Sequence, residues 1–212
     1  MDTIATTQNL VVIGTSAGGV PALQLLASQL PADFPAPVVV VIHIGAHESG
    51  MAKVLGACGP LQVTRVEDGE CMRAGRIYVA PPDQHVLVEG PLLRLSRGPK
   101  EHHTRPAVDP LFRSAALSRG SEVIGVILTG MLDDGTAGLQ AIKRCGGLAV
   151  VQDPSTAFAP SMPASAMRYV EVDHCLPLER IAEVLAKLAA SRYEGPHATA
   201  ERERHEQDLF LM

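Results

Sequence analysis

The chain has 212 residues, 46% hydrophobic and 19% charged, with a formal net charge of −5, a composition typical of one folded globular domain with a large core. The negative charge and an aromatic content of only 3% argue against nucleic acid as a partner. No apolar run reaches the roughly 18 residues that span a bilayer and the N-terminus does not resemble a signal peptide, so we expect a cytoplasmic protein without membrane insertion.

Apolar runs rich in β-branched residues alternate along the chain with stretches of helical spacing. Strands are predicted at Leu10 to Ile13, Val38 to Ile42, Arg76 to Val79, Val123 to Leu128 and Ala149 to Val151. Helices are predicted at Pro21 to Gln29, Ser49 to Cys58, Asp109 to Arg119, Gly135 to Cys145 and Pro177 to Ser191. Because several strands are apolar at nearly every position, we expect an α/β three-layer sandwich with a mostly parallel, doubly wound sheet.

Three further features complete the predicted organisation. Two short apolar runs within residues 84–95, separated by a Gly-Pro turn, predict an antiparallel β-hairpin added to the sheet. Charge and small residues dominate near the C-terminus, which predicts a folded domain over residues 1–192 and an exposed tail over residues 193–212. The four cysteines form no CxxC pair, which predicts free thiols, and we expect no metal and no other cofactor.

The first predicted strand ends in the sequence GTSAGG, residues 14–19, directly before a helical stretch. Gly14-x-Ser16-x-Gly18 fits the strand-to-helix elbow that exposes a nucleophilic hydroxyl at the edge of a sheet. A helix-capping turn fits the same residues. So does a phosphate-binding loop, because Gly14, Ser16 and Gly19 occupy the three glycine positions of a dinucleotide fingerprint. The segment taken alone leaves all three interpretations open.

Polar residues that follow strands are informative, because open α/β sheets bind ligands beyond the carboxyl ends of their strands. Ser16 follows the first strand, His43 the second, and Asp133 and Asp134 a later one. A hydroxyl needs an imidazole to take its proton near neutral pH, and a carboxylate orients that imidazole. The three residue types together predict a serine nucleophile with its base and carboxylate, although their order differs from that of the α/β-hydrolases.

Longer motifs resemble the catalytic domain of the chemotaxis protein-glutamate methylesterases, the CheB family, over roughly residues 10–188. The motifs are IGTSAGG at 13–19, His43 at a strand end, GRIYVAPPDQH at 75–85, RPAVDPLF at 105–112, VILTGMLDDG at 126–135 and, more briefly, SMP at 161–163. This family hydrolyses γ-glutamyl methyl esters on chemoreceptor helices, releasing methanol, and can also deamidate certain receptor glutamines.

The resemblance implies a role for each candidate residue. Ser16 resembles the nucleophile, His43 the general base and Asp134 the carboxylate that orients the base. Asp134 is preferred over Asp133 because the carboxylate of the family directly precedes a glycine, which is Gly135 here.

The resemblance also implies substrate contacts and reveals departures from the family. Ala17 and Met131 match positions that line the site, where a backbone N–H can serve the oxyanion, and Arg105 is a candidate for positioning the receptor glutamate. Thr104 stands where the family has a histidine, and Leu132 where it has a glycine. These departures leave the substrate preference open.

The implied function is that of a serine hydrolase demethylating glutamate 5-O-methyl esters on chemoreceptors or related signalling proteins, with methylated receptor cytoplasmic helices as partners. The family typically carries a receiver domain ahead of the esterase domain, whereas nine residues precede Leu10 here. We therefore expect the enzyme to be either constitutive or controlled by a regulatory protein.

Two other functions remain as alternatives. A non-catalytic adaptor with the same fold would bind chemotaxis signalling partners, but the intact Ser16, His43 and Asp134 argue against it. A nucleotide-binding module requires an acidic residue at the end of the second strand, where this chain has His43.

Overall fold

A computed structural model describes residues 9–43 and 50–191 of the chain. Its main sheet has seven strands in the order β3-β4-β2-β1-β7-β8-β9, and every neighbouring pair is parallel. The strands are β1 Leu10–Thr15, β2 Val38–Ile42, β3 Gln62–Arg65, β4 Arg76–Val79, β7 Val123–Ile127, β8 Leu148–Gln152 and β9 His174–Leu176. The five predicted strands are confirmed. The two that were not predicted, β3 and β9, are the short and partly polar strands at the sheet edges.

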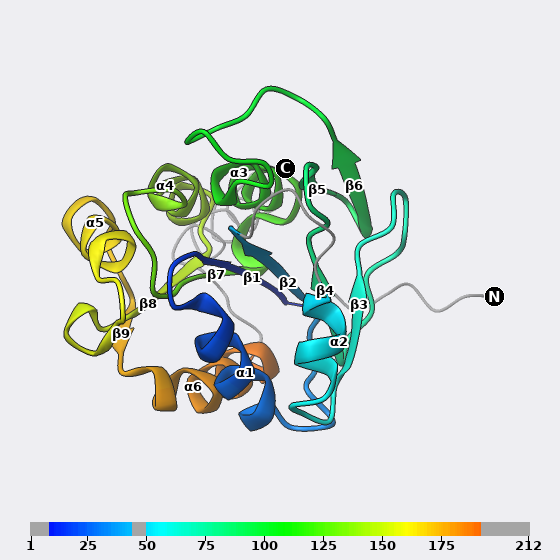
Figure 1. Ribbon diagram of the computed structural model, residues 1–212, viewed down its shortest axis with the longest axis horizontal. Helices are drawn as coiled ribbons and strands as arrows, with labels where there is room; N and C mark the ends of the chain where they lie inside the picture. The colour runs from blue at the N-terminus through cyan, green and yellow to red at the C-terminus, as the bar shows by residue number, and fades with distance from the viewer. Residues whose placement is uncertain (1–8, 44–49, 192–212) are drawn as a thin grey trace, which may run out of the picture.

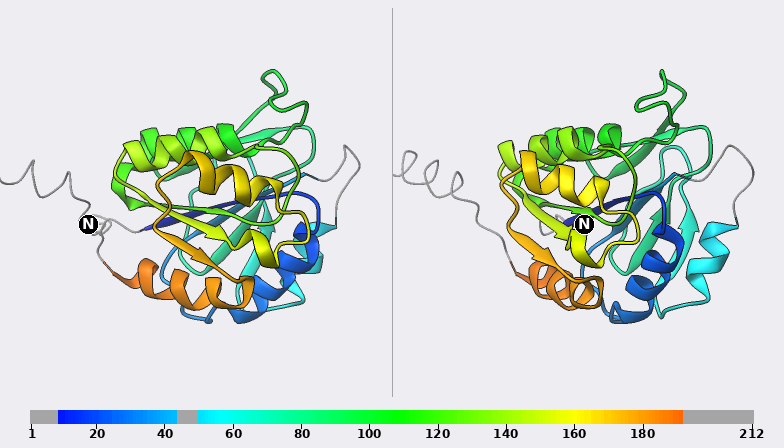
Figure 2. Two further views of the ribbon diagram at one scale, coloured as in Figure 1. Left: turned by 90° about the vertical axis from the view of Figure 1, so that its left-hand side faces the viewer. Right: turned by 60° about the vertical axis from the view of Figure 1, so that its left-hand side comes forward.

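Helices cover both faces of the sheet, so the predicted three-layer sandwich is confirmed (Figures 1 and 2). Helices α1, α2 and α6 lie on one face, and α3, α4 and α5 lie on the other. Their bounds are α1 Gly19–Gln29, α2 Met51–Gly56, α3 Val108–Arg119, α4 Thr136–Arg144, α5 Ser161–Tyr169 and α6 Leu178–Ala190, with 3-10 turns η1 Gly120–Glu122 and η2 Pro154–Thr156.

Helix α5 was not predicted, because its Pro163 and two serines resemble a loop. A proline is tolerated in the first turn of a helix, where the N–H groups have no partner within the helix, and Pro163 lies in that turn. The predicted helix start at Ser49 and the predicted C-terminal tail lie outside the described residues.

Two hydrophobic clusters fill the spaces between the layers, one on each side of the sheet. Val38 and Val40 of β2 point into the cluster under α1 and α6, while Val39 and Val41 point into the cluster under α3 and α4. Strands buried on both faces must be apolar at successive positions, which explains the unbroken apolar runs in the sequence.

The predicted hairpin exists but is not an extension of the main sheet. Strands β5 His85–Glu89 and β6 Leu92–Ser96 form a separate antiparallel sheet that packs on α3. The backbone N–H of Val88 donates to Ser114 Oγ at 3.0 Å, and that of Gly90 donates to Ser118 Oγ at 2.6 Å. Hydroxyls of α3 thus satisfy donors that pairing with another strand would otherwise have satisfied.

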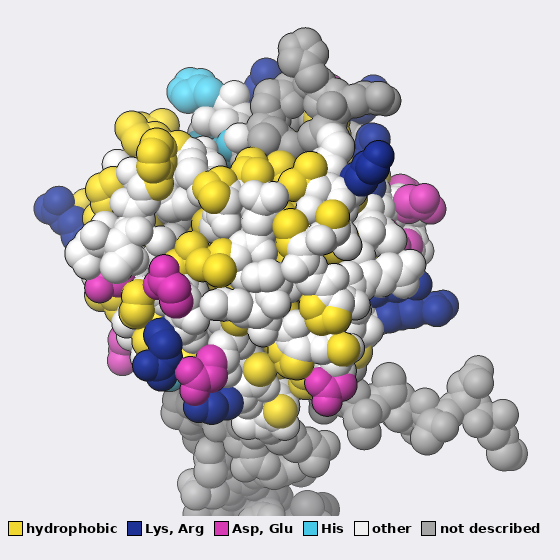
Figure 3. Space-filling model, turned by 60° about the horizontal axis from the view of Figure 1, so that its bottom comes forward, with side chains coloured by type: hydrophobic (Ala, Val, Ile, Leu, Met, Phe, Trp, Pro, Cys, Tyr) yellow, Lys and Arg dark blue, Asp and Glu magenta, His cyan; other side chains and the backbone are white. Residues whose placement is uncertain are grey.

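Within the described ranges, the helices are all too short or too polar to cross a bilayer. On the face that Figure 3 shows, charged side chains gather toward the margins, and hydrophobic side chains lie scattered among uncharged groups. All four cysteines lie in the described part and are free thiols.

Helix α3 begins directly against the end of β1, and this contact requires Gly14. A Cβ built on Gly14 would collide with both methyl groups of Val108, the first residue of α3. Both residues are fully buried, so neither can move aside into solvent.

We predict that Gly14→Ala lowers the free energy of unfolding by about 1–3 kcal/mol through overpacking. The matched control is Gly56→Ala at the exposed last residue of α2, where a new Cβ meets only Val63 at 3.6 Å. Urea denaturation should show a lower midpoint for Gly14→Ala alone. Equal midpoints for the two variants would contradict the close contact between α3 and β1.

Candidate active site

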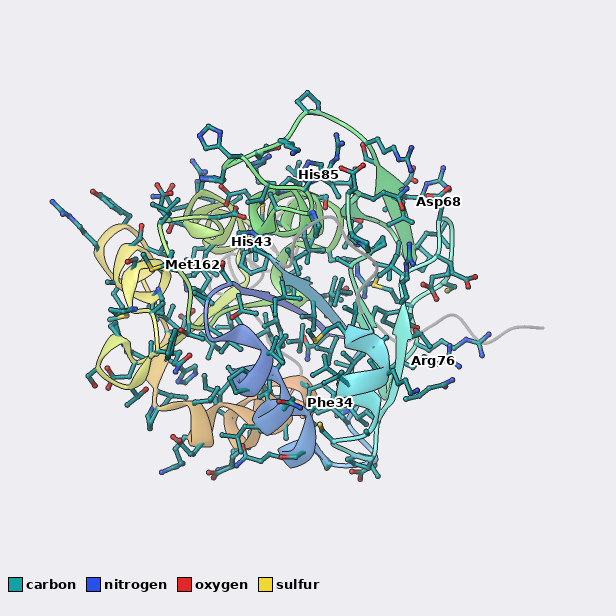
Figure 4. The ribbon with its side chains drawn as sticks, in the orientation of Figure 1. Phe34, His43, Asp68, Arg76, His85 and Met162 are labelled. Carbon is teal, nitrogen blue, oxygen red and sulfur yellow. The ribbon has the colours of Figure 1, made fainter. Side chains whose placement is uncertain are left out.

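Ser16 and His43 directly follow the neighbouring strands β1 and β2 at the carboxyl edge of the main sheet. Thr15 pairs with Ile42 in the parallel register of β1 and β2, and the backbone N–H of His43 donates to the Thr15 carbonyl at 3.2 Å. Neighbouring strands lie about 4.8 Å apart, so the two side chains start within reach of one another. Figure 4 shows His43 at the end of β2. Strand β7, on the other side of β1, leads to Asp134.

Thr129, just after β7, holds the turn that carries Ser16. Its carbonyl accepts the Ser16 N–H at 3.0 Å and the Thr15 hydroxyl at 2.7 Å, while its own hydroxyl donates to the Ala17 carbonyl at 2.9 Å. Gly18 then takes a left-handed conformation, with φ of 76°, and α1 begins at the next residue. The sharp strand-to-helix turn predicted around Ser16 is therefore present.

Gly130 leaves space for the Ser16 side chain. A Cβ at Gly130 would lie 3.0 Å from Ser16 Cβ and would collide with the sulfur of Met162 on α5. Met162 is fully buried, and Figure 4 shows it on the α5 side of the molecule. Only a glycine lets the loop after β7 pass between these two side chains.

The carboxylate of Asp134 contacts His43 and the N-terminus of α3 at the same time. Asp134 Oδ2 lies 2.8 Å from His43 Nε2 and accepts the Val108 N–H at 2.7 Å, and Oδ1 accepts the Asp109 N–H at 3.0 Å. The Asp134 side chain is 2% exposed and that of His43 is 14% exposed. The first N–H groups of a helix have no partner within the helix, so this carboxylate also caps α3.

These contacts keep Asp134 ionised. Burial by itself raises the pKa of Asp134, but the hydrogen bond with His43 and those from Val108 and Asp109 outweigh burial and lower the pKa below its ordinary value of 3.8. Asp133, the other candidate carboxylate, is 64% exposed and has its closest histidine contact with His102 instead. The carboxylate that contacts His43 is therefore Asp134.

Asp109 completes a reciprocal pair with Asp134. Its Oδ1 accepts the N–H of Gly138 in the first turn of α4 at 2.6 Å, and its Oδ2 lies 2.8 Å from His102 Nε2. Asp134 thus caps α3, the helix that contains Asp109, and Asp109 caps α4, the helix that follows Asp134. Potential ligand atoms of His102, Asp109 and Asp134 lie within 4.8 Å of one another. Hydrogen bonds already occupy these carboxylate oxygens, so we assign no metal to the cluster, and the expected absence of a cofactor stays a prediction.

Ala17 and Met131 lie beside Ser16. Ala17 directly follows Ser16, and Met131 directly follows Gly130, which lies against Ser16. Among the hydrogen bonds of the described residues, neither backbone N–H has an acceptor. Their assignment as donors to the oxyanion stays a prediction.

Arg105 has partners within the protein. Its Nε and Nη2 donate to Asp83 Oδ1 at 3.0 and 2.7 Å, and Nη1 donates to the carbonyls of Arg97 and Gly98. The guanidinium therefore joins the loop after β4 to the loop after β6. Its assignment to the receptor glutamate stays a prediction.

Exposed apolar side chains border the site. Phe158 is 82% exposed and packs on Gly18, where an added Cβ would lie 2.7 Å from Phe158 Cβ. Met131 and Leu132 are 56% and 65% exposed, and the Gly130 N–H donates to the Ala159 carbonyl at 2.9 Å, which places the two segments together. We call Phe158, Met131 and Leu132 the apolar rim.

Three contributors to the site were missed from the sequence: Thr129, His102 and Phe158. Thr129 lies inside a recognised motif, but its hydrogen bonds depend on tertiary structure. Phe158 follows η2 in a segment with no strand or helix pattern. The pair of adjacent histidines at 102 and 103 was a visible signal.

Comparison with known proteins identifies the family. A family model described as CheB methylesterase matches residues 11–185. The chain belongs to the CheB methylesterase family. The crystal structure of the Thermotoga maritima CheB methylesterase catalytic domain superposes with a TM-score of 0.83 at 36% identity, covering 86% of this chain and 100% of that one.

Two CheB methylesterase relatives illustrate the range of chain lengths. A Leptospira interrogans protein, provisionally named a protein-glutamate methylesterase/protein-glutamine glutaminase, is 41% identical over 186 residues, 87% of this chain and 96% of that protein. The Myxococcus xanthus protein-glutamate methylesterase/protein-glutamine glutaminase 5 is 40% identical over 86% of this chain. The match covers 54% of the Myxococcus protein.

We predict that Asp134→Asn lowers the free energy of unfolding at neutral pH by about 1–3 kcal/mol, the usual result of weakening buried hydrogen bonds to a charged group. A carboxylate whose pKa is lowered on folding stabilises the protein above its ordinary pKa and loses that contribution as pH falls. The difference from wild type should therefore shrink below the ordinary Asp pKa of 3.8.

Urea denaturation at neutral pH and at about pH 3 measures this difference. Asp133→Asn is the matched control, because Asp133 is 64% exposed, and it should leave the free energy of unfolding nearly unchanged at both pH values. A difference between wild type and Asp134→Asn that persists unchanged at the lower pH would refute the assignment of a lowered pKa.

Proposed function

We propose that this protein is a protein-glutamate methylesterase that uses Ser16 as its nucleophile, His43 as its general base and Asp134 as the orienting carboxylate. The observation that carries the proposal is the His43–Asp134 pair, 2.8 Å apart, at the strand end beside Ser16. The names of the relatives support the choice of a glutamate methyl ester as substrate and of glutamine deamidation as a second activity. The substrate would be carried on methylated chemoreceptors or related signalling proteins.

The arrangement supports a two-step acyl transfer. Ser16 Oγ attacks the ester carbonyl carbon while its proton passes to His43. His43 Nε2 carries a proton and donates it in a hydrogen bond to Asp134. The other ring nitrogen, Nδ1, is then unprotonated and accepts the serine proton. The resulting oxyanion is stabilised by the N–H groups of Ala17 and Met131.

Collapse of the intermediate breaks the bond to the methoxy group, which takes the proton from His43 and leaves as methanol. A water molecule then gives a proton to His43 and attacks the acyl-enzyme, releasing the free glutamate carboxylate and restoring Ser16. With a glutamine substrate, the same steps release ammonia. In both steps His43 is the residue that accepts a proton and returns it, first to the departing methoxy group and then to the Ser16 oxygen.

The apolar rim favours a polypeptide substrate over a small ester. A glutamate side chain is short, so its backbone must come close to the protein when its ester reaches Ser16. Residues next to that glutamate then meet Phe158, Met131 and Leu132, whose exposed surfaces would otherwise remain in water. Leu132 has a φ of 63°, a conformation that is disfavoured for a leucine and persists where the surrounding structure enforces it.

We predict that Ser16→Ala reduces methanol release from methylated receptor fragments by about a thousandfold or more, because the nucleophile is removed. Ser28→Ala is the matched control, since Ser28 is an exposed residue of α1 whose hydroxyl donates to the Leu25 carbonyl. Gas chromatography of released methanol is the measurement. Binding of receptor without release by wild type would favour the adaptor, and equal release by Ser16→Ala would exclude the proposed nucleophile.

We also predict that Phe158→Ala and Leu132→Gly raise KM for a methylated receptor fragment several-fold, because each removes apolar contact area worth about 1 kcal/mol or more. A small chromogenic ester lacks the neighbouring residues that would contact Phe158 and Leu132, so its turnover should change little. Leu117→Ala, which removes an 83% exposed leucine near the far end of α3, is the control. Equal effects on both substrates would show that the substitutions act through the stability of the enzyme and not through contact with the receptor.

A further inference from the structure

His102 stands against the two aspartates that cap α3 and α4. Its Nε2 lies 2.8 Å from Asp109 Oδ2 and 3.7 Å from Asp134 Oδ1, and its Nδ1 lies 3.4 Å from Asp133 Oδ1. His102 takes no part in the acyl transfer proposed for Ser16 and His43. The imidazole nevertheless touches the carboxylate on which His43 depends.

The backbone of His102 is held in an uncommon conformation. Its φ is 49°, in the left-handed region that non-glycine residues seldom occupy, and the φ of the next residue, His103, is 62°. The His103 side chain is exposed, whereas that of His102 is 28% exposed and turns toward the aspartates. Such conformations persist where the surrounding structure enforces them.

The helix termini and His43 give the two capping aspartates hydrogen bonds, but these partners carry no full positive charge when His43 is neutral. Asp109 and Asp134 side chains are each 2% exposed, and two neighbouring buried carboxylates repel one another. His43 must be neutral to act as a base. Arg113 lies 4.0 Å from Asp109 but is bound by both oxygens of Glu101 at 2.7 Å.

We propose that His102, as an imidazolium, is a positioning residue for the catalytic carboxylate: it balances the negative charges of Asp109 and Asp134 and thereby keeps Asp134 in place against His43. The inference rests on the proposed function, because it concerns the same carboxylate. It assigns a role to the segment before Pro106 that is separate from substrate binding.

The electrostatics of the cluster support this role. Burial alone lowers the pKa of His102, but the hydrogen bond with Asp109 and the charges of Asp134, Asp109 and Asp133 raise it above 6.5. Burial raises the pKa of Asp109, and the charge of Asp134 adds to this, while the bonds from Gly138 and His102 oppose it. Losing the imidazolium would therefore favour a protonated Asp109.

The groups that face His102 come from three elements. Asp109 and Arg113 lie on α3, Asp133 and Asp134 lie in the loop before α4, and Glu101 precedes His102 in the chain. His43 faces Asp134 from the end of β2. A histidine with a raised pKa stabilises the fold at low pH and loses this contribution as pH rises through that pKa. The inference therefore predicts a loss of activity on the alkaline side.

The first test does not depend on catalysis. Nuclear magnetic resonance follows the ring signals of His102 with pH, assigned by their disappearance in His102→Gln. We expect a midpoint above 6.5 in wild type and a lower midpoint in Asp109→Asn. A wild-type midpoint at or below 6.5 would overturn the inference, whether or not the protein releases methanol.

The second test compares variants by kinetics. His102→Gln keeps an N–H donor but not the charge, so kcat for methanol release should fall about tenfold or more with little change in KM, the effect of losing a charge-assisted hydrogen bond. His102→Lys keeps a charge and should restore part of kcat and move the alkaline loss to higher pH. His103→Gln, the exposed neighbour with a similar backbone, should behave as wild type.

The outcomes separate the two proposals. If wild type releases no methanol, the proposed function fails, and the resonance midpoint still decides whether His102 carries the charge. If wild type and His103→Gln release methanol, two kinetic results overturn the inference. The first is that His102→Gln has the same kcat and pH profile as wild type. The second is that kcat of His102→Lys is reduced as much as kcat of His102→Gln.

Discussion

The buried carboxylate of Asp134 is the group around which the site is organised. It accepts hydrogen bonds from the first two N–H groups of α3 and contacts His43 on its other side. A charge this deeply buried is tolerated only when it is fully paired, and here a helix terminus and an imidazole supply the partners. The same contacts therefore stabilise the protein and orient the proposed base, so fold and chemistry depend on one another at this point.

The requirement to bring α3 onto Asp134 shapes the elements around it. The helix must begin against the end of β1, where Val108 leaves no room for a side chain at position 14. The hairpin must then bond to the hydroxyls of α3 rather than to the main sheet. Asp109 of α3 in turn caps α4 by accepting the Gly138 N–H. Together these contacts fix the loop after β7, which also leaves space for Ser16 at Gly130.

Much of the fold and the core of the site could be predicted from the sequence, for identifiable reasons. Strands buried on both faces leave unbroken apolar runs, and the residues proposed as nucleophile, base and carboxylate come after such runs: Ser16 and His43 directly, and Asp134 after a short loop. Short edge strands such as β3 bury little and leave a weak pattern. Thr129 and His102 contact segments distant in the sequence, and although the two adjacent histidines were visible, the sequence did not indicate which residues His102 would contact.

The central claim is that His43 and Asp134 activate Ser16, and covalent labelling with a serine-directed phosphonate tests it most directly. Intact-mass spectrometry should show one phosphonyl group added to wild type, and peptide mapping should place it on Ser16. Labelling should be far slower in His43→Ala and in Asp134→Asn, because an unassisted hydroxyl is a poor nucleophile. Absence of labelling, or equal rates in wild type and both variants, would contradict the account.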